Sequence, residues 1–234
     1  AVAYDKLLRE AKLESLGEFA AGAGHEINNP VAAISGRAQL LLRNETDPQR
    51  RQHLLTIGAQ ALRVRDMIGD TMLFARPPEP MPQQLNLSEA VEHVLSRFSD
   101  EFQSTQLAVG GQRPPDVSVW ADETQLSVVI SELLRNAIHA SPKGGRVQVE
   151  TTSESTGDRE FARLTVSDEG PGLTDESREH LFDPFYSGRQ AGRGLGFGLS
   201  KCWRIVTNHG GQIDVSPIND PIFAITVHWP TSPE

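Results

Sequence analysis

One group of residues suited to chemistry is a helical stretch near the middle of the chain. Glu132, Asn136 and His139 recur at helical spacing, which places them on one face. A carboxylate and an amide oxygen one turn apart can hold a hard cation such as Mg²⁺, which prefers oxygen ligands and keeps several waters. An exposed polar helix face has the same composition, so the motif alone leaves both interpretations open.

A second group follows an apolar run that ends at Val166 and reads Asp-Glu-Gly-Pro-Gly from Asp168 to Gly172. A carboxylate at the end of a strand can accept a hydrogen bond from an exocyclic amine. Glycines at positions 170 and 172 would let the backbone approach a flat ring closely. An ordinary turn also has this composition.

Two further stretches are suited to binding phosphate. The segment 181–189 reads LFDPFYSGR, where aromatic residues would anchor a mobile lid and leave Ser187, Gly188 and Arg189 to meet phosphate. The segment 192–200 reads GRGLGFGLS and leads into a helix, whose first amides and dipole favour anions. It has neither the Gly-Lys-Ser/Thr of a P-loop nor the βαβ setting of a dinucleotide fingerprint.

His25 is the candidate acceptor or base of the N-terminal part. It lies within a long run of apolar residues at helical spacing, but off the apolar stripe, so we expect its side chain to point outward. Glu26 is its neighbour, Asn29 lies one turn further on, and Pro30 removes a backbone donor, which should bend the helix there. A lone histidine on a helix is usually a solvated surface group.

Two domains must position these residues. Apolar periodicity predicts helices from about Tyr4 to Arg43 and from Pro48 to Ala75, joined by a short turn and followed by four prolines. We therefore predict a helical hairpin over 1–76, a linker over 77–83 and a second domain over 84–234. One hairpin cannot bury two apolar stripes, which predicts a homodimer with a four-helix bundle, or a second domain that covers the stripe.

The second domain is predicted to be an α+β sandwich, in which helices cover one side of a mostly antiparallel sheet. Alternating or apolar segments predict strands at 84–87, 107–109, 117–120, 147–151, 161–166, 212–216 and 223–229. Helices are expected from Ser88, after Asp122 as N-cap, and from Leu199 to about Asn208.

The net charge, the cysteine count and the length of the apolar runs exclude several classes of function. The net charge of -9 comes from residues 81–234, which carry 12 Lys/Arg and 21 Asp/Glu, so non-specific nucleic-acid binding is excluded. The single cysteine, Cys202, excludes disulfides and is expected to be a buried apolar group. No apolar run is long enough to enter a membrane. We expect a cytoplasmic piece of a longer protein, whose own attachment to a membrane stays open.

Together and in this order, the Asn136 region, DEGPG, FDPFYSG and GRGLGFGLS resemble the nucleotide-binding domain of sensor histidine kinases, of the GHKL (Bergerat fold) ATPase superfamily that includes gyrase B and MutL. The segment GHEINNP around His25 resembles the phosphoacceptor box of the same kinases. The resemblance covers nearly the whole chain. It implies ATP and Mg²⁺ as ligands, a homodimer, and a response regulator receiver domain as partner.

The resemblance also implies roles for single residues. His25 would accept the γ-phosphate of ATP, Glu26 would orient or deprotonate it, and Asn29 would position a water for dephosphorylating the regulator. Asn136 would ligate Mg²⁺ and Asp168 would bind the adenine amine. The other implied nucleotide contacts are His139, Lys143, Gly170, Gly172, Ser187, Gly188, Arg189, Gly194, Leu195, Gly196 and Gly198.

Glu132 departs from the pattern, because many kinases of this family have Asn there. It is a candidate second metal ligand, a base toward His25, or a base that activates water. The last role would suit an ATP-driven conformational clamp of the gyrase B kind. A non-catalytic dimerisation and docking module is the third hypothesis, against which the four nucleotide-binding stretches argue.

Overall fold

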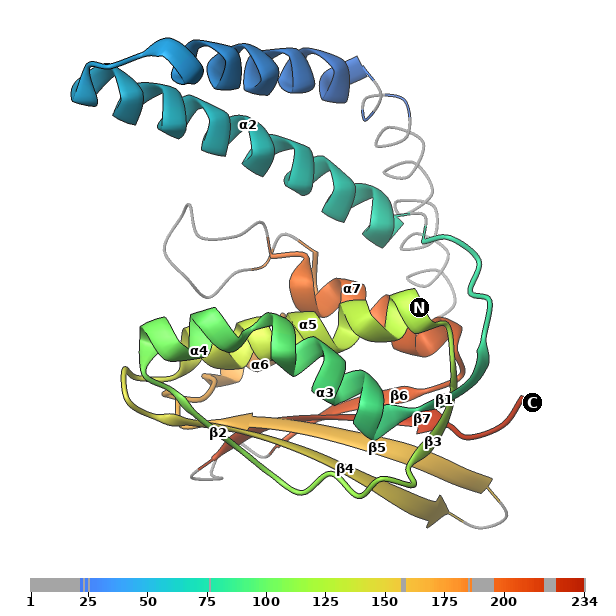
Figure 1. Cartoon of the computed structure of the whole chain (residues 1–234). Coiled ribbons are helices and arrows are strands. Elements are labelled where there is room, and N and C mark those ends of the chain that lie inside the picture. The colour runs from blue at the N-terminus through green and yellow to red at the C-terminus, as the bar shows by residue number, and fades with distance from the viewer. Residues whose placement is uncertain are drawn as a thin grey trace. The chain divides into compact units, whose positions relative to one another are not determined.

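The computed structural model describes residues 22, 24, 26–75, 77–156, 159–184, 186, 196–216 and 222–233. The chain divides into two compact units, Ala1–Pro78 and Glu79–Glu234, which are considered separately below. Figure 1 shows the helical hairpin of the first unit and the helices and sheet of the second.

The first unit is a helical hairpin, as the apolar spacing predicts. A helix over residues 26–44 is followed by three non-helical residues and by α2, Pro48–Ala75. Asp47 begins α2 as predicted, because its Oδ1 accepts the Arg50 N–H at 2.8 Å. The Arg51 guanidinium donates to the Leu42 and Glu45 carbonyls at 3.1 and 2.9 Å, which satisfies carbonyls at the end of the preceding helix.

Part of this hairpin's apolar surface stays exposed. The two helices approach closely at Gly24, where a Cβ would lie 2.8 Å from the Met72 sulfur. Val31, Ala38 and Ala61 are buried. Eight larger apolar side chains of this unit are at least 38% exposed: Ile27, Ile34, Leu40, Leu41, Leu55, Ile57, Leu62 and Val64. Such a set of exposed residues on one hairpin is typical of a helical interface.

The second unit combines twelve described elements. Its helices are α3 (Leu87–Arg97), α4 (Ser99–Thr105), α5 (Glu123–Ala140), α6 (Asp175–Glu179) and α7 (Gly198–Asn208). Its strands are β1 (Gln83–Asn86), β2 (Ala108–Gly110), β3 (Ser118–Ala121), β4 (Arg146–Thr156), β5 (Arg159–Asp168), β6 (Gln212–Val215) and β7 (Phe223–Pro230). The short α4 and α6 were not predicted from the sequence.

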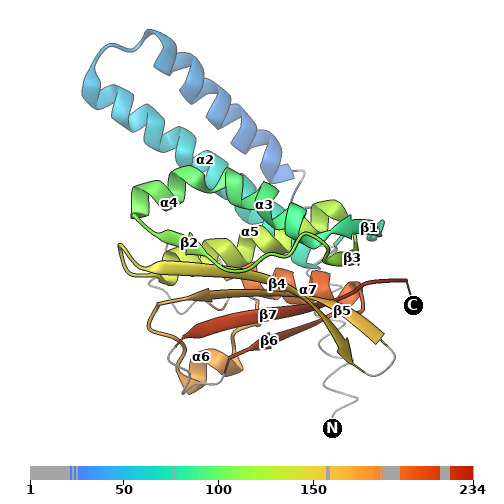
Figure 2. The same ribbon diagram turned by 60° about the horizontal axis from the view of Figure 1, so that its bottom comes forward.

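The strands form a five-stranded sheet in the order β2-β4-β5-β7-β6 and a small sheet of β1 and β3. Only the β2–β4 pair of the larger sheet is parallel. Helices α3, α4, α5 and α7 lie on one side of it (Figure 1), and Figure 2 turns its other side toward the viewer. The predicted α+β sandwich is therefore confirmed.

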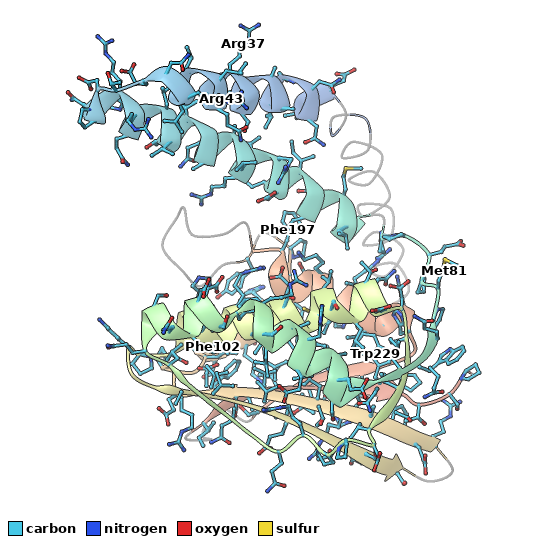
Figure 3. The ribbon with its side chains drawn as sticks, viewed as in Figure 1. Arg37, Arg43, Met81, Phe102, Phe197 and Trp229 are labelled. Carbon is cyan, nitrogen blue, oxygen red and sulfur yellow. The ribbon has the colours of Figure 1, made fainter. Side chains whose placement is uncertain are left out.

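Alternation along β5 and β7 places the core between the helices and the sheet. Ala162, Leu164 and Val166 of β5 are buried, and they pair with Trp229, Val227 and Ile225 of β7. Their neighbours in sequence face the other side and are only half-buried. Trp229 and Phe102, labelled in Figure 3, are both buried. Cys202 is fully buried, and burial raises the pKa of its thiol.

The N-terminus of α5 is held by hydrogen bonds of its N-cap residue, Asp122. The predicted N-cap Asp122 accepts the Gln125 N–H at 2.9 Å, and its other oxygen accepts the Met81 N–H at 3.0 Å. The Asp122 N–H donates to His209 Nε2 at 3.1 Å, while His209 Nδ1 lies 2.8 Å from the Ile205 carbonyl. These bonds need the neutral ring, and burial lowers the pKa of His209 accordingly. The start of α5 is thus tied to the end of α7.

Across the described residues, we found no helix long and apolar enough to cross a membrane.

Replacing Asp122 with alanine is expected to destabilise the second unit by about 1–2 kcal/mol, because one carboxylate caps α5 and also binds Met81. Urea unfolding followed by tryptophan fluorescence reports on this unit, since Trp120, Trp203 and Trp229 all lie in it. Asp116→Ala, at an exposed turn, is the matched control. A midpoint for Asp122→Ala equal to that of the control would contradict the capping role.

Candidate functional site

Asp168 is a buried carboxylate at the end of β5. The alternation that buries Leu164 and Val166 places Asp168 on the same face, and it is 4% exposed. Within the described residues, its carboxylate accepts one hydrogen bond, from the Gly170 N–H at 2.9 Å. Burial raises the pKa of Asp168 to about 6, and the Gly170 hydrogen bond only partly opposes this. The carboxylate therefore keeps acceptor capacity that an amine donor can use.

Gly170 lets the loop after β5 contact the end of α5. A Cβ on Gly170 would lie 2.6 Å from Asp168 Oδ1 and 2.8 Å from the Ala140 carbonyl oxygen, closer than atoms can approach. Gly172 has φ +70°, a conformation that glycine adopts without strain. The close contact at residue 170 brings two of the predicted stretches together, the α5 motif and the Asp168 loop.

The polar face of α5 meets the start of α7. A Cβ on Gly198 would lie 2.8 Å from Glu132 Oε2 and 3.8 Å from Asn136 Nδ2. Asn136 Nδ2 is buried and has no hydrogen-bond partner in the part of the chain that the structure describes. The oxygen and the nitrogen of an amide side chain are told apart by their hydrogen-bond partners. Either the oxygen or the nitrogen of Asn136 can therefore face Gly198. A buried amide without partners beside a glycine turn is typical of a site that a ligand completes.

The glycine turn before α7 presents backbone donors. Gly196 has φ +73°, Phe197, labelled in Figure 3, is buried, and α7 begins at Gly198. The first amides of an α-helix have no partner within the helix, and the helix dipole adds partial positive charge. The turn is thus suited to binding a phosphate group.

Two residues that the sequence analysis missed surround Glu132. Glu132 Oε1 accepts from Lys201 Nζ at 3.0 Å and from Arg135 NH1 at 2.9 Å. Lys201 lies on the buried face of α7, between Ser200 and Cys202. A lysine within the apolar stripe of a helix was a readable signal, because such a side chain is rarely buried unless it is paired.

The segment around α6 is fixed at one end. Arg178 donates to the Val215 carbonyl at 2.9 Å and also to the Ser216 carbonyl, which attaches α6 to the end of β6. Tyr186 donates from its hydroxyl to Ser177 Oγ at 3.1 Å. The hydrogen bond between His180 and Asp183 raises the pKa of His180. These contacts hold α6 and Tyr186, and the rest of the segment predicted to form a lid lies outside the described residues.

Four further predicted site residues belong to the described part of the chain, and all four are exposed. Glu26 and Asn29 are exposed on the first helix, and His139 and Lys143 are exposed at the end of α5 and in the loop after it. The remaining predicted residues lie outside the described ones: His25, Ser187, Gly188, Arg189, Gly194 and Leu195.

The described group has the chemistry of an adenine nucleotide site. A carboxylate with spare acceptor capacity suits an exocyclic amine, and the glycine turn suits phosphates. Asn136 and Glu132 offer oxygen atoms to Mg²⁺, although Glu132 Oε1 already faces two cations. In the part of the chain that the structure describes, no cluster of three or more His, Cys, Asp or Glu side chains could hold a metal by itself. Mg²⁺ would therefore depend on phosphate oxygens as well.

Comparison with known proteins decides the family. The His Kinase A (phospho-acceptor) domain matches residues 15–80, and the histidine kinase-, DNA gyrase B- and HSP90-like ATPase domain matches residues 121–233. The chain belongs to the histidine kinases. It has the phosphoacceptor and ATPase domains of their catalytic core, in the order that the sequence motifs predicted.

Individual proteins and solved structures that are similar to this chain support the same family. The sensor histidine kinase ZraS of Klebsiella oxytoca is 31% identical over 208 residues, which cover 88% of this chain and 44% of that protein. This histidine kinase chain therefore spans less than half the length of that relative. Full-length ShkA in complex with AMPPNP has the same fold, with a TM-score of 0.79 at 21% identity over 91% of this chain and 45% of that one. Histidine kinase ThkA in complex with response regulator TrrA gives a TM-score of 0.67 at 24% identity, over 98% and 66%.

Replacing Asp168 with asparagine is expected to stabilise the ligand-free protein, and increasingly so as the pH rises from 4 to 8. The folded state raises the pKa of Asp168 to about 6 from 3.8, so the folded protein holds a proton that the unfolded chain releases, and the wild type loses stability through this window. The difference reaches at most about 3 kcal/mol at pH 8.

Urea unfolding at pH 4, 6 and 8 measures this effect, with Asp116→Asn as an exposed control. A pH-independent difference between Asp168→Asn and the wild type would show that the carboxylate is not held in an unfavourable environment. The same variant is expected to bind ATP at least tenfold more weakly, because an amide group accepts less strongly than a carboxylate.

Gly170→Ala is expected to cost about 1–3 kcal/mol of folding stability, because the added methyl group overlaps the Ala140 carbonyl and the Asp168 carboxylate. ATP affinity should fall with it. Gly110→Ala is the matched control, since a Cβ there meets no atom within 4 Å. Equal unfolding midpoints for the two variants would show that the loop does not need this close approach.

Proposed function

We propose that this chain is the catalytic core of a sensor histidine kinase, which transfers the γ-phosphoryl group of ATP to His25 and then to an aspartate of a response regulator. The observation that carries the proposal is the contact of three separate stretches around one site: Asp168 with Gly170, the Asn136 face of α5, and the glycine turn at Gly198. The phosphoacceptor domain matched at residues 15–80 supplies the second half of the reaction.

Each part of the site has a task in this proposal. Asp168 accepts a hydrogen bond from the adenine amine, and Gly170 and Gly172 keep side chains away from the ring. The glycine-rich sequence from Gly194 to Gly198 binds phosphates, and Asn136, with Glu132 Oε2 as a second ligand, holds Mg²⁺. When bound, Mg²⁺ would neutralise charge on the phosphates. His139, Lys143, Ser187, Gly188, Arg189 and Leu195 are further nucleotide contacts in this proposal.

The acceptor is His25. Its imidazole nitrogen forms a bond to the γ-phosphorus while the bond between that phosphorus and the bridging oxygen of ADP breaks. The proton on the other ring nitrogen is held or taken by Glu26, whose side chain is exposed on the first helix. Asn29, also exposed, would orient a water when the core dephosphorylates its regulator. The division into a hairpin over 1–76, a linker over 77–83 and a catalytic domain over 84–234 matches these two tasks.

Two partners follow from the proposal. The exposed apolar side chains of the hairpin support a homodimer, because a second copy would bury them in a four-helix bundle. A receiver domain is the natural acceptor of the phosphoryl group, and the related kinase ThkA was solved with its response regulator. Because the reaction consumes ATP, this core would work in the cytoplasm.

Autophosphorylation of His25 is tested by incubating the chain with Mg²⁺ and γ-labelled ATP. We expect label on the protein that is lost in acid, as a phosphorus–nitrogen bond requires, and no label on His25→Ala, which still binds ATP. His53→Ala, exposed on α2, is the matched control and should label normally. Steady phosphate release without a labelled protein would instead favour the ATPase clamp with Glu132 as base.

A further inference from the structure

A largely buried ion pair joins α5 and α7 beside the candidate nucleotide site. Lys201 Nζ and Arg135 NH1 both donate to Glu132 Oε1, at 3.0 and 2.9 Å. The Lys201 and Glu132 side chains are only 5% and 14% exposed, while that of Arg135 is 47% exposed. The lysine–glutamate pair is therefore largely removed from water, and the arginine is largely in it.

The position of this pair is unusual for a group that serves only packing. Glu132 Oε2 lies 2.8 Å from where a Cβ on Gly198 would be, so a carboxylate touches the first residue of the helix that should receive phosphates. A negative charge there opposes a polyphosphate, and charges in a poorly hydrated site interact strongly over several ångströms. The site can bind an anion only if this carboxylate is compensated.

Lys201 is placed to provide that compensation. It lies three residues after Gly198 on α7, one turn beneath the glycine turn, and its ammonium reaches back across the helix interface to Oε1. Arg135 is exposed, so solvent and salt screen its contribution. Buried ion pairs can often be replaced by apolar pairs without loss of stability, so stability alone does not require a charged pair here.

We propose that Lys201 is a positioning residue for the polyphosphate of the nucleotide. It holds Glu132 by Oε1 and cancels its charge, so that the glycine turn of α7 accepts a polyanion. The inference rests on the proposed nucleotide site and assigns to Lys201 the selectivity of that site for phosphorylated over unphosphorylated adenosine.

The test measures the affinities of the full chain for ATP, ADP and adenosine by calorimetry, once with Mg²⁺ and once with EDTA. EDTA removes any effect through metal ligation. For Lys201→Met we expect the ratio of ATP to adenosine affinity to fall about tenfold or more, with a smaller fall for ADP, because an uncompensated carboxylate repels each phosphate. Adenosine itself should bind within about twofold of the wild type.

Two variants separate charge from structure. Adding Glu132→Gln to Lys201→Met removes the uncompensated charge and should restore the ATP preference in EDTA, whereas a structural defect would persist. Lys201→Arg keeps the charge and should keep the preference. Equal losses for ATP and adenosine in Lys201→Met, without restoration in the double variant, would overturn the inference.

If Lys201→Met alone does not fold, Glu132→Gln decides the question. It removes one negative charge from beside Gly198, so ATP preference in EDTA should rise above that of the wild type, and an unchanged ratio overturns the inference. A failure of the proposed function can be told apart from a failure of the inference about Lys201. If the variants show this charge dependence but the wild type never labels His25, the role of Lys201 is supported and the kinase reaction is refuted. If the wild type binds no ATP, both are refuted.

Discussion

The packing of α5 against α7 is the contact on which the site depends. Glu132 and Asn136 lie on one helix, and Gly198 and Lys201 lie on the other. The bond from the Asp122 N–H to His209 fixes the start of α5 to the end of α7, and the Lys201–Glu132 pair joins the two helices further along. Because the helices are fastened at two places, their side chains keep one spacing, and the glycine turn is presented against a fixed polar face.

Two polar groups of the site, at Asp168 and Asn136, lower the stability of the ligand-free protein. Within the described residues, the buried carboxylate of Asp168 accepts one backbone hydrogen bond, and its burial, which raises its pKa, disfavours the charged form. The buried Nδ2 of Asn136, which has no hydrogen-bond partner among the described residues, adds a second unfavourable element. Proteins keep such groups where a ligand relieves them, so the ligand-free state is less stable than the fold alone would allow.

Much of this architecture was readable from residue spacing. Apolar period and capping residues located α2, α5 and α7, and strict alternation located β5 and β7, because burial of one face imposes those periods. Helices α4 and α6 are short and mostly polar, so no periodic signal marked them. The Lys201–Glu132 pair joins residues 69 positions apart, and only the folded chain shows that the two meet. Likewise, the sequence left open whether Gly170 approaches a flat ring or belongs to an ordinary turn, and only the folded chain shows that it lies against the Ala140 carbonyl.

The hydrogen bond from Met81 to Asp122 has a mechanical consequence. Met81 lies within the proline-rich segment, and its N–H is already hydrogen-bonded to Asp122, the carboxylate that caps α5. Any swivel between the histidine-bearing hairpin and the nucleotide-bearing half must therefore be confined to the few residues before position 81. Tension along this tether would be applied to the first turn of α5, the helix that carries Glu132 and Asn136, rather than to the sheet.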